Sequence, residues 1–244
     1  MDDRAAVESA ASGGENKAAY VRDAFSRIAP RYDLLNHLLS FNIDRAWRRM
    51  AIRELGIERC PAGRYLDLCA GTLDVSAALA ATRGFAGSIV SVDFAEPMLI
   101  AGRAKAAGRR ISPVAGDALN LPLENECMAG AIVAFGIRNV SDLDAALREV
   151  HRVLEPGSRF VILEFSTPRS PFVNTAYQLY FRSVLPAIGG LISGHRTAYK
   201  YLPKSVANFP IMEDLARRMR GAGFSGVTWR SITLGIAAIH SGIR

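Results

Sequence analysis

The chain has 244 residues, of which 50% are hydrophobic, and a formal net charge of +7. This length suits one α/β domain with additions, and the hydrophobic content excludes a disordered chain. The three cysteines have neither C-x-x-C spacing nor metal-ligand spacing with the four histidines, so we expect no disulfide framework, no metal site and a reducing, cytoplasmic environment.

The excess of positive charge leaves three interpretations open, namely nucleic-acid binding, contact with an anionic membrane surface, or a basic exterior. Much of the charge comes from arginines between Arg22 and Arg59, in helix-like sequence. These arginines lack the aromatic interleaving of proteins that stack single-stranded bases. We therefore expect no nucleic-acid partner.

The first part of the chain, residues 1–16, is polar and partly acidic and contains no apolar stretch of the signal-peptide kind, which predicts a disordered leader. From Lys17 to residue 60 the apolar residues follow one helical face, with breaks near Pro30 and at Phe41-Asn42. This pattern predicts a helical cap at 17–60, which begins a single domain over 17–244. No segment reaches the roughly 18 charge-poor apolar residues of a membrane span.

Strand-like and helix-like patterns alternate through residues 61–165, the predicted cofactor-binding core. Such alternation indicates βαβ units and a parallel sheet, because parallel neighbours need long crossover connections. A turn is predicted at Glu155–Ser158. The predicted strands are 64–68, 88–93, 111–115, 129–135 and 159–165, and the predicted helices between them are 74–83, 96–107 and 141–154.

The first two predicted strands each end in an acid, Asp67 and Asp93, and a small-residue loop with Gly71 follows the first. Ligands of doubly wound sheets sit outside the carboxyl ends of the strands, where an acid ending the second strand can bind both ribose hydroxyls of an adenosine. A dinucleotide site also needs G-x-G-x-x-G, whereas Leu73 stands in place of the second glycine. The loop therefore favours S-adenosylmethionine, which has an adenosine but no phosphate, over NAD.

The strand and helix rhythm breaks at residues 166–210, which we interpret as an inserted lid, and residues 211–244 then form a closing helix and two strands. Phe172 to Ile192 is apolar and aromatic, with Asn174, Gln178 and Arg182 on one polar stripe. Two interpretations stay open for this amphipathic stretch. In the first, the stretch is structural and packs on the sheet edge or in a dimer contact. In the second, it is a lid that shields the reaction and opens toward a bilayer. In the second case the cations drawn to anionic headgroups would be Arg182, Arg196, Lys200 and Lys204.

Several short motifs occur together in the chain. They are Y-D-L-L-N at 32–36, L-S-F at 39–41, W-R at 47–48, the loop at 67–74, F-G-I-R-N-V at 135–140, R-V-L-E-P-G at 152–157 and L-E-F-S at 163–166. This combination resembles the ubiquinone/menaquinone biosynthesis C-methyltransferases, over roughly Val21 to His240. The resemblance implies a Rossmann-like class I methyltransferase sheet with an N-terminal helical cap and a late helical insertion. It also implies S-adenosylmethionine as cofactor and methylation of a ring carbon of a prenylated quinol precursor.

The same resemblance, with the strand-end argument for Asp93, implies which residues form the site. Those expected to bind the cofactor are Asp67, Gly71, Thr72, Asp93, Asp117, Ala118 and Ala134. Arg138 is expected to stabilise negative charge on the acceptor ring, Asn139 to orient a hydroxyl or a water, and Tyr32 to close over the ring. Since arginine keeps its proton, the proton acceptor would be a water or a carboxylate.

The sequence departs from the family pattern at two positions. Leu73 stands where the family has glycine, and Ala134 where it usually has serine. A branched side chain at position 73 would either crowd the methionine end of the cofactor or, if φ must be positive there, strain the turn.

Other functions stay open at this stage. The cofactor site alone does not define the acceptor, so another lipid or aromatic compound is an alternative substrate. A scaffold that has lost turnover is a third hypothesis. The expected partners are the prenylated quinol and a transient membrane surface, with peripheral contact at the inner membrane face, and a homodimer is compatible with the sequence.

Overall fold

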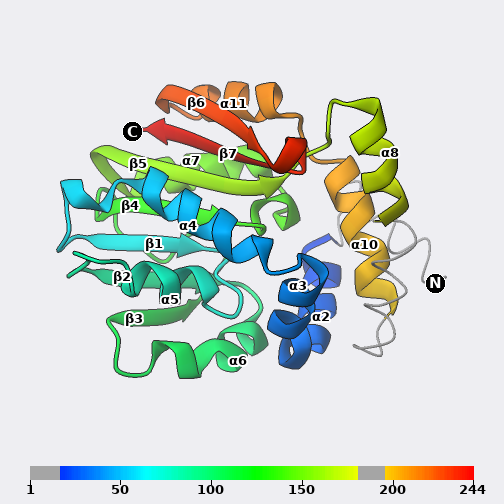
Figure 1. The fold of residues 1–244 in the computed structure, drawn as a ribbon. Helices are drawn as coiled ribbons and strands as arrows, with labels where there is room; N and C mark the ends of the chain where they lie inside the picture. Colours follow the sequence, from blue (N-terminus) through cyan, green and yellow to red (C-terminus); the bar gives the residue numbers. More distant parts are fainter. Residues whose placement is uncertain (1–16, 181–195) are drawn as a thin grey trace.

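The computed structural model describes residues 17–180 and 196–244. The predicted leader and the part of the lid at 181–195, which includes Arg182, lie outside the described residues. The described chain is a layered α/β structure, with a central sheet and a group of helices beyond one end of its strands (Figure 1).

Seven strands form the sheet, in the order β3-β2-β1-β4-β5-β7-β6. The first five are parallel, while β7 runs antiparallel to both β5 and β6. This arrangement confirms the predicted parallel sheet and its closing antiparallel pair. The bounds are β1 Arg64–Leu68, β2 Ser88–Asp93, β3 Ile111–Ala115, β4 Met128–Ala134, β5 Leu154–Phe165, β6 Ser225–Ile232 and β7 Ala237–Ile243.

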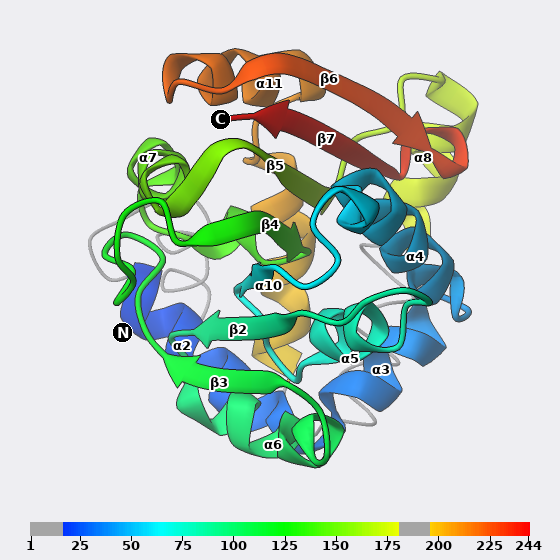
Figure 2. The ribbon, with the colours of Figure 1, turned by 90° about the vertical axis from the view of Figure 1, so that its left-hand side faces the viewer.

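Helices cover both faces of the sheet, because alternate residues of each buried strand point to opposite sides. Tyr65 of β1 packs in the same core cluster as Trp47, whereas its neighbour Leu66 packs in the other cluster with Leu147. The first face carries α4 (Ile43–Leu55), α5 (Asp74–Ala80) and α6 (Glu96–Ala106), and the second carries α7 (Leu143–Val153) and α11 (Met212–Gly221) (Figure 2).

The turn predicted at Glu155–Ser158 is not a boundary between elements. Strand β5 begins at Leu154, which pairs with Met128, and the next pair along the ladder joins Gly130 to Arg159. The intervening residues form an irregularity inside the strand, with Gly157 at φ +82°. The predicted turn therefore corresponds to a local irregularity of the backbone. The prediction that the strand starts at residue 159 is wrong, because β5 already begins at Leu154.

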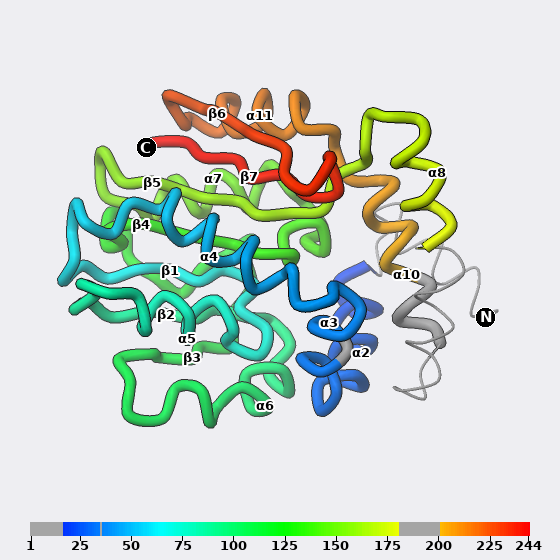
Figure 3. The backbone as a smooth tube through the Cα atoms, in the orientation of Figure 1, coloured from blue at the N-terminus to red at the C-terminus, as the bar shows by residue number. Residues whose placement is uncertain are grey.

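The cap and the lid lie together beyond the carboxyl ends of the parallel strands (Figures 1 and 3). Of the predicted cap at 17–60, α2 (Lys17–Ile28), a 3₁₀ turn at Ala29–Arg31 and α3 (Tyr32–Leu39) lie here, whereas α4 packs on the sheet. From here on, the cap means α2 to α3. The described lid contains α8 (Pro171–Leu179) and α10 (Arg196–Ala207). Ile28 of the cap is buried in one cluster with Tyr177 and Val206 of the lid. None of the described helices is both long enough and apolar enough to cross a membrane.

Leu73 occupies a left-handed turn at the start of α5, with φ +67°. Its side chain is fully buried in the core cluster that contains Val75 and Leu79. It is absent from the lining of the cavities at the strand ends. Of the two consequences expected for this position, the structure therefore shows the positive φ rather than crowding of a ligand.

We expect Leu73→Ala to lower the free energy of unfolding by about 2–5 kcal/mol, as is usual for a buried leucine. Leu73→Gly should cost about 1 kcal/mol less than Leu73→Ala, because glycine adopts a positive φ without steric penalty. Urea denaturation measures both, and calorimetric titration should show unchanged affinity for S-adenosylmethionine. Equal stability of the two variants would contradict backbone strain at this position.

Candidate functional site

The described residues enclose two large neighbouring cavities at the carboxyl ends of the parallel strands. The larger cavity has a volume of about 510 Å³ and is lined by the ends of β1, β2, β3 and β4 and by the cap. The smaller cavity has a volume of about 370 Å³ and is lined mainly by the cap, the lid and aromatic side chains. Both volumes lie in the range of small-molecule sites. Phe25, Tyr32 and Phe135 line both cavities, so these rings form a shared wall.

Asp93 ends β2 and lines the larger cavity. Its two carboxylate oxygens accept backbone hydrogen bonds, Oδ2 from Gly71 N at 2.8 Å and Oδ1 from Ala95 N at 2.8 Å. Burial raises the pKa of Asp93, and the two amide hydrogen bonds oppose that rise. Since each carboxylate oxygen has more than one lone pair, the group can still accept from two ribose hydroxyls.

Glycines allow the loops around the larger cavity to approach one another. Gly71 has φ +53°, in the left-handed region. A Cβ added to Gly136 would lie 2.3 Å from Cys69 Cβ, so the loops after β1 and β4 meet at a distance that only glycine permits. The backbone of both loops therefore borders the cavity directly.

Four further predicted residues line the larger cavity, namely Asp117, Ala118, Ala134 and Asn139. Asp117 is exposed, and its Oδ1 accepts from Leu119 N at 2.9 Å. Asn139 is buried, and its Oδ1 has no hydrogen-bond partner among the described residues. Because an unpaired buried acceptor is costly, the Asn139 amide suits a hydrogen-bond donor of a bound ligand. The resemblance implies a role for Asn139 at the acceptor, and the structure places its amide in the larger cavity.

Asp67 and Thr72 do not line either cavity. Asp67 Oδ2 instead accepts from Ser76 N at 3.0 Å and from Ser76 Oγ at 2.5 Å, which ties β1 to the first turn of α5. Thr72 Oγ1 donates to Asp33 of the cap. The structure therefore gives both residues contacts that support the loop, and it provides no support for the direct cofactor contact that we expected of them.

Burial raises the pKa of Asp67 to about 7, against an ordinary value of 3.8, although the hydrogen bonds from Ser76 oppose the rise. Between about pH 4 and about pH 7 the unfolded chain thus releases this proton while the folded chain retains it. We expect the stability of the protein relative to Asp67→Asn to fall as the pH rises through this window. Urea denaturation at several pH values measures it, and a constant difference would contradict a buried, protonated Asp67.

Arg138 lines the smaller cavity as part of a buried ion pair. Its Nη1 lies 2.7 Å from Glu164 Oε1, and its guanidinium lies over the Phe165 ring at 5.5 Å. Burial raises the pKa of Glu164, and the Arg138 charge opposes that rise. Nε of Arg138 is buried without a hydrogen-bond partner in the described part of the chain, so it can still donate to a ligand oxygen.

Tyr32 begins α3 and lies in the wall between the cavities. Burial raises the pKa of its hydroxyl, against a hydrogen bond with Asn36 and the charges of Arg138 and Arg48. A neutral phenol is therefore the stable form. The position agrees with the expected role of Tyr32 in closing over an acceptor ring.

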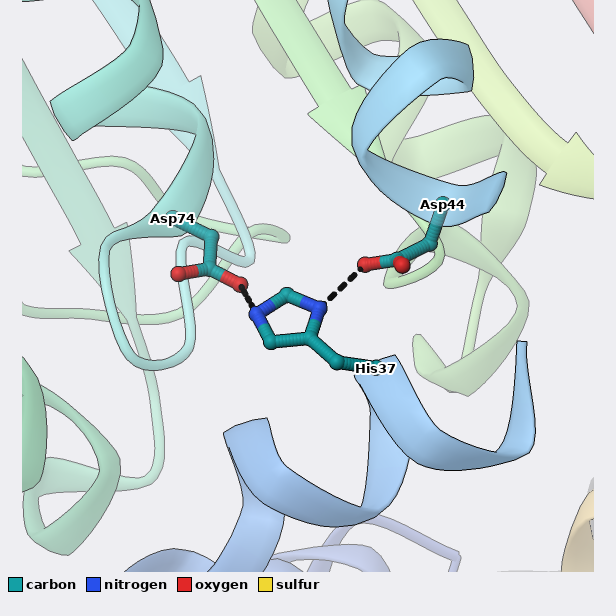
Figure 4. A group of neighbouring side chains, drawn as sticks. All are labelled: His37, Asp44 and Asp74. Atoms are coloured by element: carbon teal, nitrogen blue, oxygen red, sulfur yellow. Dashed lines mark hydrogen bonds and ion pairs between the residues drawn. The ribbon is translucent and has the colours of Figure 1, made fainter. Parts of the chain in front are cut away.

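The sequence analysis missed a polar cluster between the cap and the loop after β1. His37 lies between two carboxylates, with Nδ1 2.8 Å from Asp44 Oδ2 and Nε2 3.7 Å from Asp74 Oδ2 (Figure 4). Arg48 pairs with Asp44, and Lys105 Nζ lies 2.6 Å from Asp74 Oδ1, so cations of the protein already balance these carboxylates. The spacing of Asp44 and Arg48, four residues apart beside the W-R motif, was the available signal.

The donor set of the larger cavity fits S-adenosylmethionine. A strand-end carboxylate is available for the ribose, and the buried Asn139 oxygen is available for a donor such as the methionine ammonium. The cavity also contains Glu96 and Asp117 and the backbone of the glycine loops. These groups provide no nest of amides of the kind that a pyrophosphate requires, which agrees with the preference for S-adenosylmethionine over NAD.

Comparisons with known proteins agree with this assignment. A model of the ubiE/COQ5 methyltransferase family matches residues 14–244. The protein named Demethylmenaquinone methyltransferase from Thermus thermophilus is 47% identical over 222 residues, which are 90% of this chain and 99% of the relative. The Ubiquinone/menaquinone biosynthesis C-methyltransferase UbiE of Syntrophotalea carbinolica is 48% identical over 225 residues, 91% of this chain and 93% of the relative.

Solved structures share the fold. A SAM-dependent methyltransferase from Thermotoga maritima aligns with a TM-score of 0.60 at 21% identity, covering 91% of this chain and 98% of that one. This likeness confirms the Rossmann-like class I sheet predicted from the sequence.

Proposed function

We infer that this chain, which belongs to the ubiE/COQ5 methyltransferase family, is an S-adenosylmethionine-dependent C-methyltransferase of menaquinone or ubiquinone biosynthesis. The observation that carries the inference is the pair of cavities with a shared wall. One cavity has the polar groups that suit an adenosine and a methionine, and the other is apolar and aromatic, as a prenylated ring requires. The wall of Phe25, Tyr32 and Phe135 is where the methyl donor and the ring would meet.

The acceptor carbon becomes nucleophilic when the neighbouring ring hydroxyl loses its proton. When bound, S-adenosylmethionine supplies an electrophilic methyl group on a sulfonium. The protein residues align the ring, exclude water and stabilise negative charge on the ring oxygen. Arg138, held in the cavity wall by Glu164, provides a fixed positive charge and an unpaired Nε donor for this purpose.

The alternative of a scaffold without turnover rested on Leu73. Because the Leu73 side chain is buried in the core and lies outside the cavity lining, this argument for lost cofactor binding no longer holds. Methylation of a different lipid or aromatic acceptor remains the second candidate, since the apolar wall of the smaller cavity would accept other rings.

Acceptor assays test the function directly. We expect the protein to transfer methyl from S-adenosylmethionine to a chemically reduced demethylated prenylquinol, with mass spectrometry identifying ring methylation. A naphthoquinol and a benzoquinol acceptor, tested in parallel, distinguish a menaquinone from a ubiquinone precursor. If neither quinol is methylated, the proposed function is wrong.

Asp93→Asn tests the cofactor assignment. The substitution replaces a charged acceptor for two ribose hydroxyls, each hydrogen bond being worth about 1.5–3 kcal/mol, so we expect at least a tenfold loss of affinity in calorimetric titration. Asp144→Asn is the matched control, because this aspartate pairs with Arg218 on α11 and lies in neither cavity. Unchanged affinity of Asp93→Asn would place the adenosine elsewhere.

We further propose that the mouth of the smaller cavity contacts a membrane surface. Phe41 and Ile43 line this cavity and are nevertheless 76% and 40% exposed, so they mark its mouth. Leu34 and Leu38 extend the exposed apolar surface along α3, and Phe172 and Leu179 are exposed on α8. An apolar rim of this kind suits transfer of a prenylated substrate out of a bilayer.

Tyr177 of the lid is buried against Ile28 of the cap. Of the cations expected to contact headgroups, Arg182 and the side chains of Arg196 and Lys200 lie outside the described residues. The lid helices do line the smaller cavity, through Val173, Ala176 and Leu202 among others. This position supports the interpretation of the insertion as a cover for the acceptor.

We expect the protein to co-sediment with anionic liposomes at low salt. Replacing Leu38 and Phe41 together by serine should weaken this binding by on the order of tenfold, because less apolar surface enters the bilayer. Ile100→Ser is the control, since Ile100 is 53% exposed on α6 and lines neither cavity. Equal binding of both variants would show that the rim is not a membrane contact.

A further inference from the structure

The proposed reaction requires a group that takes the proton of the ring hydroxyl, and Arg138 cannot do so. Of the described residues that line the smaller cavity, Asp44 alone has a carboxylate. In the described part of the chain its Oδ1 accepts one hydrogen bond, from Ser40 Oγ at 2.6 Å. A lone pair of Oδ1 therefore remains for an acceptor hydroxyl.

Asp44 is also close to the shared wall of the two cavities. Its partner Arg48 lines the smaller cavity and places its guanidinium over the Phe135 ring, 5.6 Å from the ring centre. Nε of Arg48 is buried and has no hydrogen-bond partner among the described residues. The carboxylate and an available donor are thus neighbours at the place where the ring would lie.

The His37 imidazole lies between Asp44 and Asp74 (Figure 4). The charged groups that face Asp44 and His37 come from four elements, namely Asp33 of α3, Arg48 of α4, Asp74 of α5 and Lys105 of α6. His37 thus lies between two carboxylates, and each of them also contacts a cation.

We propose that Asp44, with His37 as the positioning residue beside it, is the base that takes the proton from the ring hydroxyl of the acceptor. This inference rests on the proposed function. Asp44 contacts the hydroxyl, and the pair holds the proton as an imidazolium between Asp44 and Asp74. Burial alone would raise the pKa of Asp44, but the hydrogen bond from Ser40 and the charge of Arg48 lower it below its ordinary value, so the carboxylate is ionised and can accept a proton.

The O–H bond breaks and the proton goes to the pair, leaving a ring oxygen with negative charge, which Arg48 and Arg138 in the cavity wall stabilise. The ring carbon then attacks the methyl carbon, so that a C–C bond forms and the C–S bond breaks with its electron pair on sulfur. The same ring carbon loses its hydrogen as a proton to water, and the pair returns its proton to the ring oxygen. One proton is released for each methyl transferred.

The test compares turnover with two reduced prenylquinols, one of them carrying a fluorine on the ring that makes the hydroxyl more acidic. Loss of a general base costs on the order of 10²-fold in rate. We expect Asp44→Asn to lower kcat by this factor on the unsubstituted quinol and by clearly less on the fluorinated one, because a more acidic hydroxyl depends less on a base.

The pH profile of kcat for Asp44→Asn should lose the low-pH limb of the wild type and instead rise with hydroxide. His37→Gln should show the same pattern with smaller losses.

Asp33→Asn is the matched control, because it removes a carboxylate of the same cluster that lines neither cavity. It should lower kcat by the same factor on both quinols and keep the wild-type pH profile. If Asp44→Asn behaves like this control, Asp44 only supports the structure and the proposal is wrong. Should Asp44→Asn fail to bind S-adenosylmethionine, the comparison of His37→Gln with Asp33→Asn decides in the same way. Wild-type protein that methylates neither quinol would instead overturn the proposed function, and the base with it.

Discussion

The attachment of the cap to the loop after β1 is the interaction on which both cavities depend. It consists of buried and half-buried charges. Lys105 of α6 contacts both Asp33 and Asp74, Thr72 donates to Asp33, and His37 Nε2 and Arg48 Nη2 each lie 3.7 Å from Asp74 Oδ2. The attraction within such pairs hardly exceeds the cost of removing the charges from water, so they add little to the free energy of unfolding. They instead favour one arrangement of the elements that carry them. Paired charges hold α3 in one position against the loop after β1, which an apolar contact of equal area would not require.

The aromatic wall between the cavities depends on the same attachment. Phe135 lies against Phe165 with ring centres 4.7 Å apart and against Trp47 at 5.9 Å, so rings from β5, α4 and the loop after β4 support one another. Trp47 Nε1 donates to Thr233 Oγ1 at 2.8 Å, which joins this group to the turn before β7. Because these rings are packed on several sides, the wall between the cavities is held in one position.

Backbone conformation in the loop after β1 shows how the chain tolerates a departure from its family. Leu73 accepts a positive φ, which is costly for a branched residue, and its side chain gains burial in the core. Asp67 is likewise committed to Ser76 rather than to a ligand. Leu73 and Asp67 thus support the loop, while Gly71 and the carboxylate of Asp93 are among the groups that border the cavity.

The sequence by itself determined the sheet, the cofactor class and the position of Asp93. Strand periodicity and small-residue loops are local properties, and the carboxyl ends of parallel strands must meet at one edge, so β1, β2 and β3 were predicted to the residue. The Arg138–Glu164 pair and the His37 cluster were decided only by the tertiary structure. Their partners come from different elements, 26 residues apart for Arg138 and Glu164 and up to 72 apart for Lys105 and Asp33. No local pattern encodes which of these charges become neighbours, since that depends on how the cap packs on the sheet. The same packing decides which cavity each residue lines, as for Asn139 in the larger cavity.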